Sequence, residues 1–154
     1  MTSTVEERRL ALGLRLPAIV APRGNFRPYV LSGSLLHLSG KGAPLREDGA
    51  PVPKVGAEVT VEQARAHAQE VGLYLLALVQ QALGGFDRVR RVVKVFGMVN
   101  AVPDFTSHTE VINGCSDLLV AVVGERGEHA RSAIGVASLP KGFAVEIEAI
   151  VEFA

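Results

Sequence analysis

Arg131 is the residue whose type and position most clearly suggest chemistry. It opens the otherwise apolar segment 131–136, directly after the polar residues 124–129. A guanidinium presents several N–H donors in one plane and can bind a carboxylate through two parallel hydrogen bonds. If Arg131 is fixed at the start of a strand, we expect it to bind a small carboxylate.

Glu146 is the candidate partner of this arginine. It interrupts an apolar C-terminal segment and would face the same space as Arg131 if the last two strands lie close together. A carboxylate in partly apolar surroundings can hold and polarise a water molecule. A structural ion pair or two solvated strand residues would use the same side chains, so spacing alone does not identify a reaction.

The histidines, the cysteine and the glycines of the chain do not form the patterns that bind metals or nucleotide cofactors. The four histidines, His37, His67, His108 and His129, are dispersed and the chain has one cysteine, so no metal site is expected. Cys115 falls on the apolar face of a predicted helix, where a thiol usually packs as a small hydrophobic group. The glycines match no phosphate-binding loop, and no cofactor is predicted.

Composition and charge narrow the class of protein. With 154 residues, 48% of them hydrophobic, the chain is expected to form one domain with its own core. Sixteen basic and sixteen acidic residues cancel, which argues against nucleic acids and anionic membrane surfaces as partners. The N-terminus lacks the apolar core of a signal peptide, no apolar run could span a bilayer, and a lone cysteine fits a reducing compartment. We therefore expect a cytoplasmic location.

Two long helices are predicted to position the candidate residues. The first begins with a capping-box sequence at residues 60–63, carries apolar residues at helical spacing, and ends at the glycines 84–85. The second follows Pro103 and Asp104, has apolar residues near one helical face, and ends at Gly124.

Five strands are predicted, at residues 29–31, 35–38, 89–99, 132–137 and 144–153. The first two flank Ser32-Gly33-Ser34, which is the composition of a hairpin turn, and Gly40 and Gly42 are expected to close the second. Simple alternation in the third strand assigns one face to four valines: Val89, Val93, Val95 and Val99.

The order of these elements predicts an α+β domain. A hairpin, a helix, a strand, a helix and two further strands suggest a single mixed sheet with both long helices packed on one face. A short helix, capped by Thr4 and ending near residue 12, precedes them. We therefore expect an N-terminal extension at residues 1–20 and one domain at residues 21–154.

Two C-terminal segments carry the signature of a known family. Residues 130–140 (Ala-Arg-Ser-Ala-Ile-Gly-Val-Ala-Ser-Leu-Pro) and 145–150 (Val-Glu-Ile-Glu-Ala-Ile) strongly resemble the Rid family, also called the YjgF-like or L-PSP endoribonuclease family. Weaker matches are residues 27–29 to its Gly-Pro-Tyr motif, residues 38–42 to its Ser-Gly-Gln segment and residues 83–89 to its Leu-Gly-x-x-x-x-Val stretch. The resemblance covers roughly residues 21–153.

This resemblance implies a chorismate-mutase-like subunit, assembled as a homotrimer with sites in the clefts between subunits. It also implies hydrolysis of 2-imino or 2-enamino acids to 2-keto acids and ammonia. Arg131 matches the family's carboxylate-binding arginine, and Glu146 matches its water-positioning glutamate. Tyr29 and Ser39 match residues that line the cleft, and Asn113 matches a cleft asparagine.

Some positions depart from the family pattern and indicate a divergent subgroup. Ala133, counted with the substrate-binding residues, stands where the archetypal branch often has a cysteine, and Lys41 and residues 113–117 also differ. Three functions follow: an imine deaminase, a non-catalytic module that binds a small carboxylic acid, and RNA cleavage. RNA cleavage is the weakest because the net charge is zero, aromatic residues are few and no histidines are paired. The sequence assigns no role to Lys41, Cys115 or Asp117.

Overall fold

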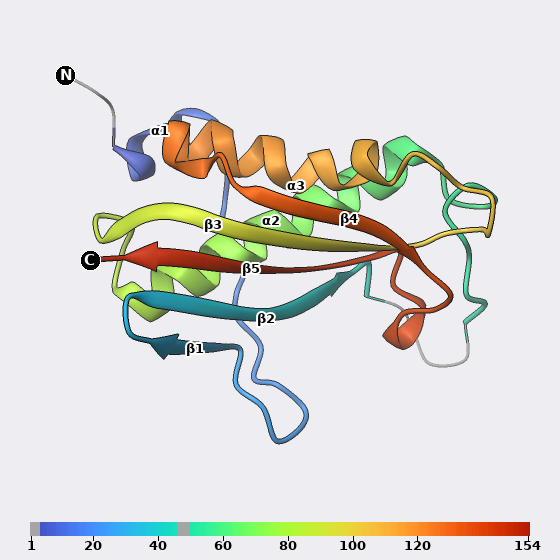
Figure 1. Cartoon of the computed structure of the whole chain (residues 1–154), viewed down its shortest axis with the longest axis horizontal. Coiled ribbons are helices and arrows are strands. Elements are labelled where there is room, and N and C mark those ends of the chain that lie inside the picture. The colour runs from blue at the N-terminus through green and yellow to red at the C-terminus, as the bar shows by residue number, and fades with distance from the viewer. Residues whose placement is uncertain (1–3, 46–49) are drawn as a thin grey trace.

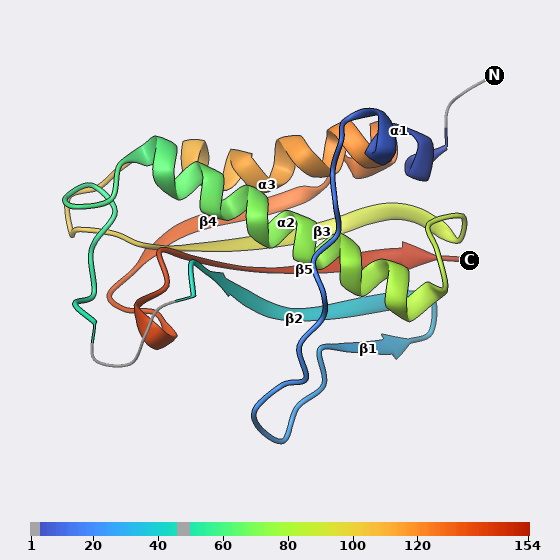
Figure 2. The same cartoon turned by 180° about the vertical axis from the view of Figure 1, so that it is seen from behind.

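Five strands form one mixed sheet, and two long helices cover one of its faces (Figure 1, Figure 2). A computed structural model describes residues 4–45 and 50–154, so the first three residues of the expected N-terminal extension lie outside the described residues. The strands are β1 (Tyr29–Ser32), β2 (Leu35–Ala43), β3 (Val89–Asn100), β4 (Ala130–Val136) and β5 (Val145–Phe153). The helices are α1 (Val5–Ala11), α2 (Val61–Leu83) and α3 (His108–Val123), with 3-10 turns η1 (Gly124–Gly127) and η2 (Pro140–Gly142). The predicted α+β architecture is confirmed.

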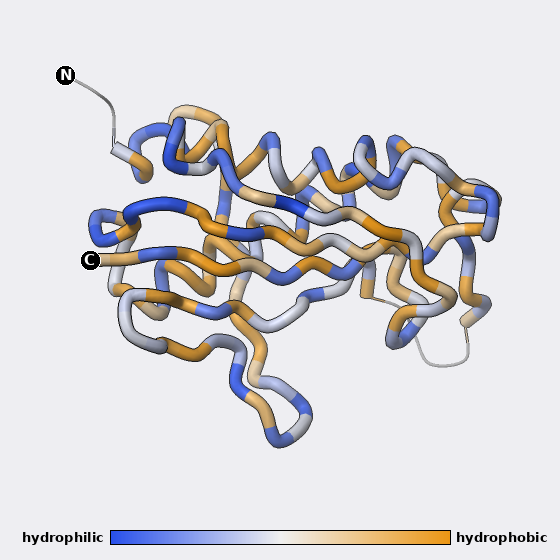
Figure 3. Tube along the Cα trace, in the orientation of Figure 1, coloured by the Kyte–Doolittle hydropathy of each residue, from blue (hydrophilic) through white to orange (hydrophobic). Residues whose placement is uncertain are grey.

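The last strand of the chain lies in the middle of the sheet, whose order is β1-β2-β5-β3-β4. β5 is antiparallel to β2 and β3, whereas β4 is parallel to β3 at the edge. Alternate residues of β5, from Val145 to Phe153, are buried on the helix side. Glu146 and Glu148 lie on the opposite, uncovered face. Hydrophilic and hydrophobic residues are mixed along the strands (Figure 3).

Helix α2 has the predicted boundaries because both of its ends are capped. The Thr60 hydroxyl accepts a hydrogen bond from the Gln63 backbone N–H at 3.1 Å, and the Gln63 side chain accepts one from the Thr60 N–H at 2.9 Å. Gly84 ends the helix with a left-handed backbone, φ 74°, that residues with a side chain rarely adopt. Among the described residues, no helix is long and apolar enough to cross a membrane.

Helix α3 confirms the second predicted helix and packs closely on α2. It ends at Gly124, as expected. A Cβ atom at Gly114 would lie 2.0 Å from the backbone oxygen of Arg65 on α2. Because a backbone atom cannot move aside as a side-chain end can, only glycine allows the two helices to approach this closely.

Strand β3 departs from the predicted alternation. Val92, and not Val93, is buried together with Val89 and Val95. The register between β3 and β5 shifts between residues 89 and 91 and again between residues 92 and 94. Such β-bulges change the face on which the next side chain lies. The prediction for Val93 is wrong because it assumed an uninterrupted ladder.

The hairpin of β1 and β2 is confirmed, but β2 continues beyond its predicted end. Gly33 supplies the positive φ of 59° in the turn. β2 does not end at Gly40, because its pairing with β5 resumes after a bulge between Leu38 and Lys41. Ser39 and Gly40 lie within this bulge.

The last two strands of the chain are not neighbours, because β3 lies between β4 and β5 and pairs with both. The chain passes through η2 and crosses β3 before β5 begins (Figure 1). Arg131 and Glu146 were expected to face the same space if the last two strands lay close together. Within a single chain these strands are not neighbours, so this condition is not met.

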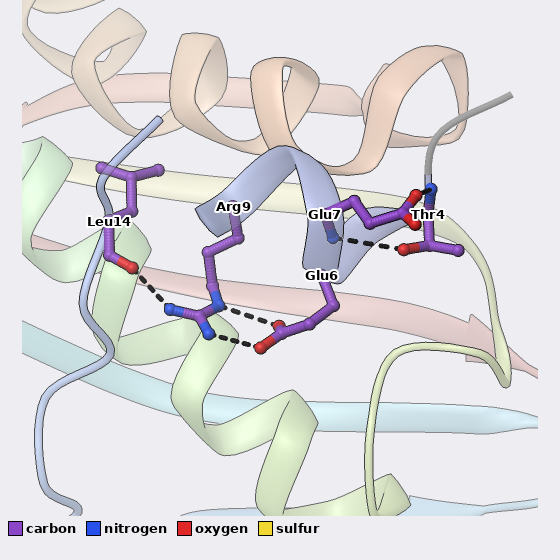
Figure 4. Close-up of polar contacts among 5 residues, drawn as sticks. All are labelled: Thr4, Glu6, Glu7, Arg9 and Leu14. Atoms are coloured by element: carbon purple, nitrogen blue, oxygen red, sulfur yellow. Dashed lines mark hydrogen bonds and ion pairs between the residues drawn. The ribbon is translucent and has the colours of Figure 1, made fainter. Parts of the chain in front are cut away.

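The expected short N-terminal helix is confirmed as α1. Thr4 and Glu7 form a capping box at its start. Arg9 pairs with Glu6 and donates a hydrogen bond to the Leu14 carbonyl at 2.5 Å (Figure 4). These contacts fix the turn by which the chain leaves the helix.

Helix α1 is also joined to the end of α3. The Val5 side chain is 3% exposed and belongs to the hydrophobic core. Arg8 donates from Nε to the Val122 carbonyl at 2.7 Å and from Nη2 to the Val123 carbonyl at 3.1 Å. The last carbonyls of a helix lack partners within the helix and carry partial negative charge, so a guanidinium stabilises them.

Candidate functional site

Arg131 lies on the face of β4 that is turned toward α3. Its Nη1 atom donates hydrogen bonds to the Asn113 side-chain oxygen at 2.8 Å and to the Ser116 hydroxyl oxygen at 3.0 Å. Asn113 and Ser116 are three residues apart on α3 and therefore share one side of the helix. The partly buried guanidinium is fixed between the edge strand and the helix.

His129, in the loop before β4, extends this polar group. Its Nε2 atom lies 2.9 Å from the Ser116 hydroxyl oxygen, and its Nδ1 atom lies 2.6 Å from the Gly127 carbonyl oxygen. Burial lowers the pKa of His129 below its ordinary value; the hydrogen bond to Gly127 opposes this lowering and the Arg131 guanidinium adds to it. The imidazole is therefore neutral at pH 7.

The neutral imidazole gives these hydrogen bonds one direction. A carbonyl oxygen can only accept, so Nδ1 of His129 carries the proton and Nε2 accepts from the Ser116 hydroxyl. The Ser116 oxygen in turn accepts from Arg131. We refer to Arg131, Asn113, Ser116 and His129 as the arginine cluster.

The remaining donors of Arg131 are open to a ligand. Within residues 4–45 and 50–154, its Nε and Nη2 atoms have no hydrogen-bond partner. The N–H groups of these two atoms point in the same direction within the guanidinium plane and match the two oxygens of a carboxylate. Ala133, two residues along β4, lies on the same face of the strand as Arg131.

Glu146 lies on the opposite face of the sheet. Arg131 pairs with Val95 of β3, whereas Glu146 pairs with Met98 of the same strand. Because residues an odd number apart point to opposite faces, the guanidinium and the carboxylate lie on different sides of the sheet. Their backbones are about 10 Å apart across the strands and about 10 Å apart along them. One chain cannot bring both groups to the same small molecule.

The surroundings of Glu146 nevertheless change its acidity. Burial raises the pKa of this half-buried carboxyl above its ordinary value, and neighbouring Glu148 raises it further. Gly40 in the bulge of β2 lies against it, since a Cβ there would be 3.3 Å from the Glu146 carboxyl carbon. The carboxyl therefore gains a proton more easily than a solvated glutamate.

Tyr29 and Ser39 lie on β1 and β2, at the end of the sheet opposite β4, and of the two Ser39 adjoins a residue that contacts Glu146. Tyr29 on β1 pairs with β2 and packs partly against the core. The Ser39 hydroxyl donates to the Arg27 carbonyl at 2.6 Å, and Ser39 directly precedes the glycine that contacts Glu146.

The six predicted site residues thus form two groups. Arg131, Ala133 and Asn113 lie where β4 meets α3, and Tyr29, Ser39 and Glu146 lie on β1, β2 and β5.

Three residues without an assigned role make contacts elsewhere. Burial raises the pKa of the Cys115 thiol to about 12, although Arg131 acts in the opposite direction, so this thiol is not a nucleophile at neutral pH. Asp117 pairs with Arg65 at 2.5 Å on the surface, and the Lys41 ammonium lies 4.2 Å from the centre of a tyrosine ring on α2. The described part of the chain contains no group of three His, Cys, Asp or Glu side chains placed to hold a metal ion.

Ser116 and His129 were not among the predicted site residues. His129 stands two residues before Arg131, a spacing that places both on one side of an extended chain. Ser116 follows Asn113 by three residues on a predicted helix. These spacings identify candidates, but only the packing of α3 on β4 brings the two pairs together.

Comparison with known proteins gives the family. The family model described as "YjgF/chorismate mutase-like, putative endoribonuclease" matches residues 6–145. Protein TCP17 of Trypanosoma cruzi is 46% identical over 142 residues, which cover 92% of this chain and 89% of that protein.

Two solved structures show how the chain compares with its relatives. Atu1372 from Agrobacterium tumefaciens, a protein of unknown function, has a TM-score of 0.84 at 42% identity and covers 98% of this chain and 94% of its own. RidA from a Psychrobacter species has a TM-score of 0.56 at 28% identity, with coverage of 90% and 94%. The chain belongs to the YjgF-like family, also called the Rid family.

Proposed function

We propose that the protein hydrolyses reactive 2-imino acids, and the 2-enamino acids that tautomerise to them, to 2-keto acids and ammonia. The observation that carries this proposal is the geometry of Arg131, which is held by two side chains of α3 and keeps a free pair of donors. In a 2-imino acid the electrophilic carbon is bonded directly to the carboxylate. Binding the carboxylate therefore also fixes the carbon that water must attack.

Hydrolysis of the imine requires two proton transfers. Water adds to the imine carbon while one of its protons passes through Glu146 to the nitrogen, which gives a carbinolamine. A second transfer, from the new hydroxyl to the nitrogen, breaks the C–N bond and releases ammonia and the keto acid. The raised pKa of Glu146 suits a group that must take up a proton and return it.

We infer that Arg131 and Glu146 meet across a subunit interface. Within one chain they lie on opposite faces of the sheet, whereas Arg131 contacts Asn113, and Ser39 adjoins the glycine that lies against Glu146. A site composed of Arg131, Ala133 and Asn113 from one subunit and Tyr29, Ser39 and Glu146 from its neighbour would contain every predicted residue.

The surface of the sheet supports assembly as a homotrimer. The face away from the helices is uncovered in the single chain, and Val30 and Ile134 on this face are 50% and 43% exposed. The edge of β4 also lacks a neighbouring strand in the sheet of described residues. Light scattering should give a mass near three times the 16.3 kDa of the chain. A mass of one chain would contradict the composite site.

The activity can be tested with imines formed in place. 2-Iminopropionate or 2-iminobutyrate is generated from its amino acid, and the release of keto acid is compared with spontaneous hydrolysis. Arg131→Ala should lose most of the acceleration, and Arg65→Ala, a surface arginine, should keep it. Glu146→Gln should lose catalysis while it still binds keto acid. No acceleration by the wild type, or full activity of Arg131→Ala, would refute the proposal.

Complementation tests the composite site directly. Trimers that contain both Arg131→Ala and Glu146→Gln subunits would hold some interfaces where an intact arginine faces an intact glutamate. Random mixing of equal amounts should restore about a quarter of the wild-type sites. If both residues acted within one subunit, mixing would restore no activity.

A second candidate function is binding without catalysis, in which the protein senses a small carboxylic acid. The separation of Arg131 from Glu146 within the chain favours it, because the arginine cluster alone can bind a carboxylate. Calorimetry with 2-oxobutyrate and benzoate decides between the two functions. Binding that depends on Arg131, without any acceleration of imine hydrolysis, would support the binding module.

A further inference from the structure

We propose that Ser116 and His129 are positioning residues that fix the Arg131 guanidinium for side-on binding of a carboxylate, and that protonation of His129 releases this hold. This role rests on the proposed carboxylate binding by Arg131 and specifies how that site is oriented and regulated. Neither residue belongs to the groups predicted from the sequence.

The hydrogens on Arg131 determine which of its donors remain for a ligand. Nη1 carries two hydrogens, and the structure gives it two acceptors, Asn113 Oδ1 at 2.8 Å and Ser116 Oγ at 3.0 Å. Both hydrogens are therefore engaged. The pair of donors left for a bidentate ligand is Nε and Nη2, which lie along one side of the guanidinium. The arginine cluster thus selects the edge of Arg131 that a ligand meets.

The Ser116 hydroxyl can rotate about its C–O bond. A free hydroxyl can turn its hydrogen toward Arg131 and lose its value as an acceptor. Neutral His129 prevents this, because its Nε2 accepts the hydroxyl hydrogen while its Nδ1–H is held by the Gly127 carbonyl. The Ser116 lone pairs then remain directed to Arg131.

Acid changes the hydrogen bonding of His129. A protonated His129 has a donor at Nε2, so the Ser116 oxygen would have to accept from two cations at once. The imidazolium and the guanidinium would also repel each other. Arg131 on β4 is the charged group that acts on His129. Cys115, next to Ser116 on α3, is an uncharged thiol, and Glu128, next to His129 in the chain, is exposed. Protonation of His129 therefore weakens the hold on Arg131.

The sign of the pH dependence follows from the environment of His129. Burial holds its pKa below the ordinary value of 6.5, so the network is intact at neutral pH and breaks only in more acidic solution. Carboxylate binding should weaken as the pH falls through the pKa of His129.

Nuclear magnetic resonance of the free protein tests the network without any ligand. His129 should carry its proton on Nδ1, and Ser116→Ala and Arg131→Gln should each shift its titration midpoint. Ser132→Ala is the matched control, because Ser132 lies on the other face of β4 near Lys94. If neither variant changes the His129 tautomer or midpoint, the proposal is overturned, whatever the protein binds.

Calorimetry with 2-oxobutyrate at several pH values tests the effect on binding. Ser116→Ala and His129→Ala should lower the affinity about tenfold and remove its acid dependence. His129→Gln offers an acceptor near the position of Nε2 and cannot be protonated, so it should restore the affinity and keep it at acid pH. Wild-type affinity and pH dependence in Ser116→Ala and His129→Ala would contradict the positioning role. If only Arg131→Ala lost binding, the proposed function would stand, but Ser116 and His129 would have no positioning role.

Discussion

At the scale of single residues, a lysine cannot replace Arg131 although it would keep the positive charge. Arg131 contacts Asn113 and Ser116 through one nitrogen and keeps a second pair of donors free. A lysine ammonium has all of its donors on one atom. We expect Arg131→Lys to weaken binding of 2-oxobutyrate at least tenfold, about 1.4 kcal/mol, as measured by calorimetry. Wild-type affinity in this variant would mean that charge alone binds the ligand.

Glu146 gives the folded protein a pH dependence opposite to that of a salt-bridged carboxylate. Its folded pKa is raised, first by burial and then by Glu148, above the reference value of 4.5. The resulting stabilisation is present below the unfolded pKa and is lost as the pH rises through the folded pKa. Glu146→Gln should therefore gain stability relative to the wild type in urea unfolding as the pH rises above about 4.5, the reference pKa. A constant difference between the two proteins would contradict this prediction.

At the scale of elements, the contact between α2 and α3 positions the arginine cluster. Ala at position 114 would place a Cβ 2.0 Å from the Arg65 backbone oxygen, so α3 must shift. We expect Gly114→Ala to lower the free energy of unfolding by about 1–3 kcal/mol and to weaken keto-acid binding, because α3 carries Asn113 and Ser116. Gly72→Ala is the comparison, since the contact under 3.0 Å that its Cβ would make is with the end of the Leu118 side chain, at 2.8 Å, and the nearest backbone atom, Cys115 Cα, would lie 3.5 Å away. An equal or larger loss in Gly72→Ala would refute the explanation.

The sequence allowed prediction of the elements better than of their arrangement. The caps at Thr60 and Gly84 are local signals, and α2 begins and ends where they predict. The bulges in β2 and β3 depend on the neighbouring strand, so alternation misplaced Val93, and the glycines 40 and 42, expected to close β2, lie within it. Strand order also depends on the whole sheet, and nothing near Arg131 indicates that β3 separates β4 from β5.

In the candidate site, too, single residues were easier to predict than their arrangement. Arg131 was predicted from its place at a strand start and from a family resemblance, Asn113 from the resemblance alone, and the structure places the two in contact. Ser116 and His129 join them only because α3 packs beside β4, a contact between elements that sequence spacing does not encode. The sequence alone could not place Glu146 relative to Arg131, because it does not show on which face of the sheet each strand residue lies.

At the scale of the whole molecule, the uncovered face of the sheet is expected to be the contact between subunits. Ile134 lies on this face of the edge strand and is 43% exposed. A charge there would be buried without a partner in an assembled trimer. Ile134→Glu should yield a folded monomer, with a light-scattering mass near 16.3 kDa and an unchanged circular dichroism spectrum.

The matched control for this prediction is Val120→Glu. Val120 lies on α3, on the helical side of the molecule, and is 37% exposed. This variant should keep the mass of the wild type. A trimeric Ile134→Glu protein, or a monomeric Val120→Glu protein, would move the interface to another surface.

The central place of β5 in the sheet has a consequence for synthesis of the protein. β2 and β3 are joined only through β5, which is translated after both of them. A nascent chain that still lacks these residues exposes two apolar strands with unpaired edges, and such chains tend to aggregate. We therefore expect the sheet to close only after β5 has left the ribosome, and a chain truncated before Val145 to depend on chaperones for its solubility.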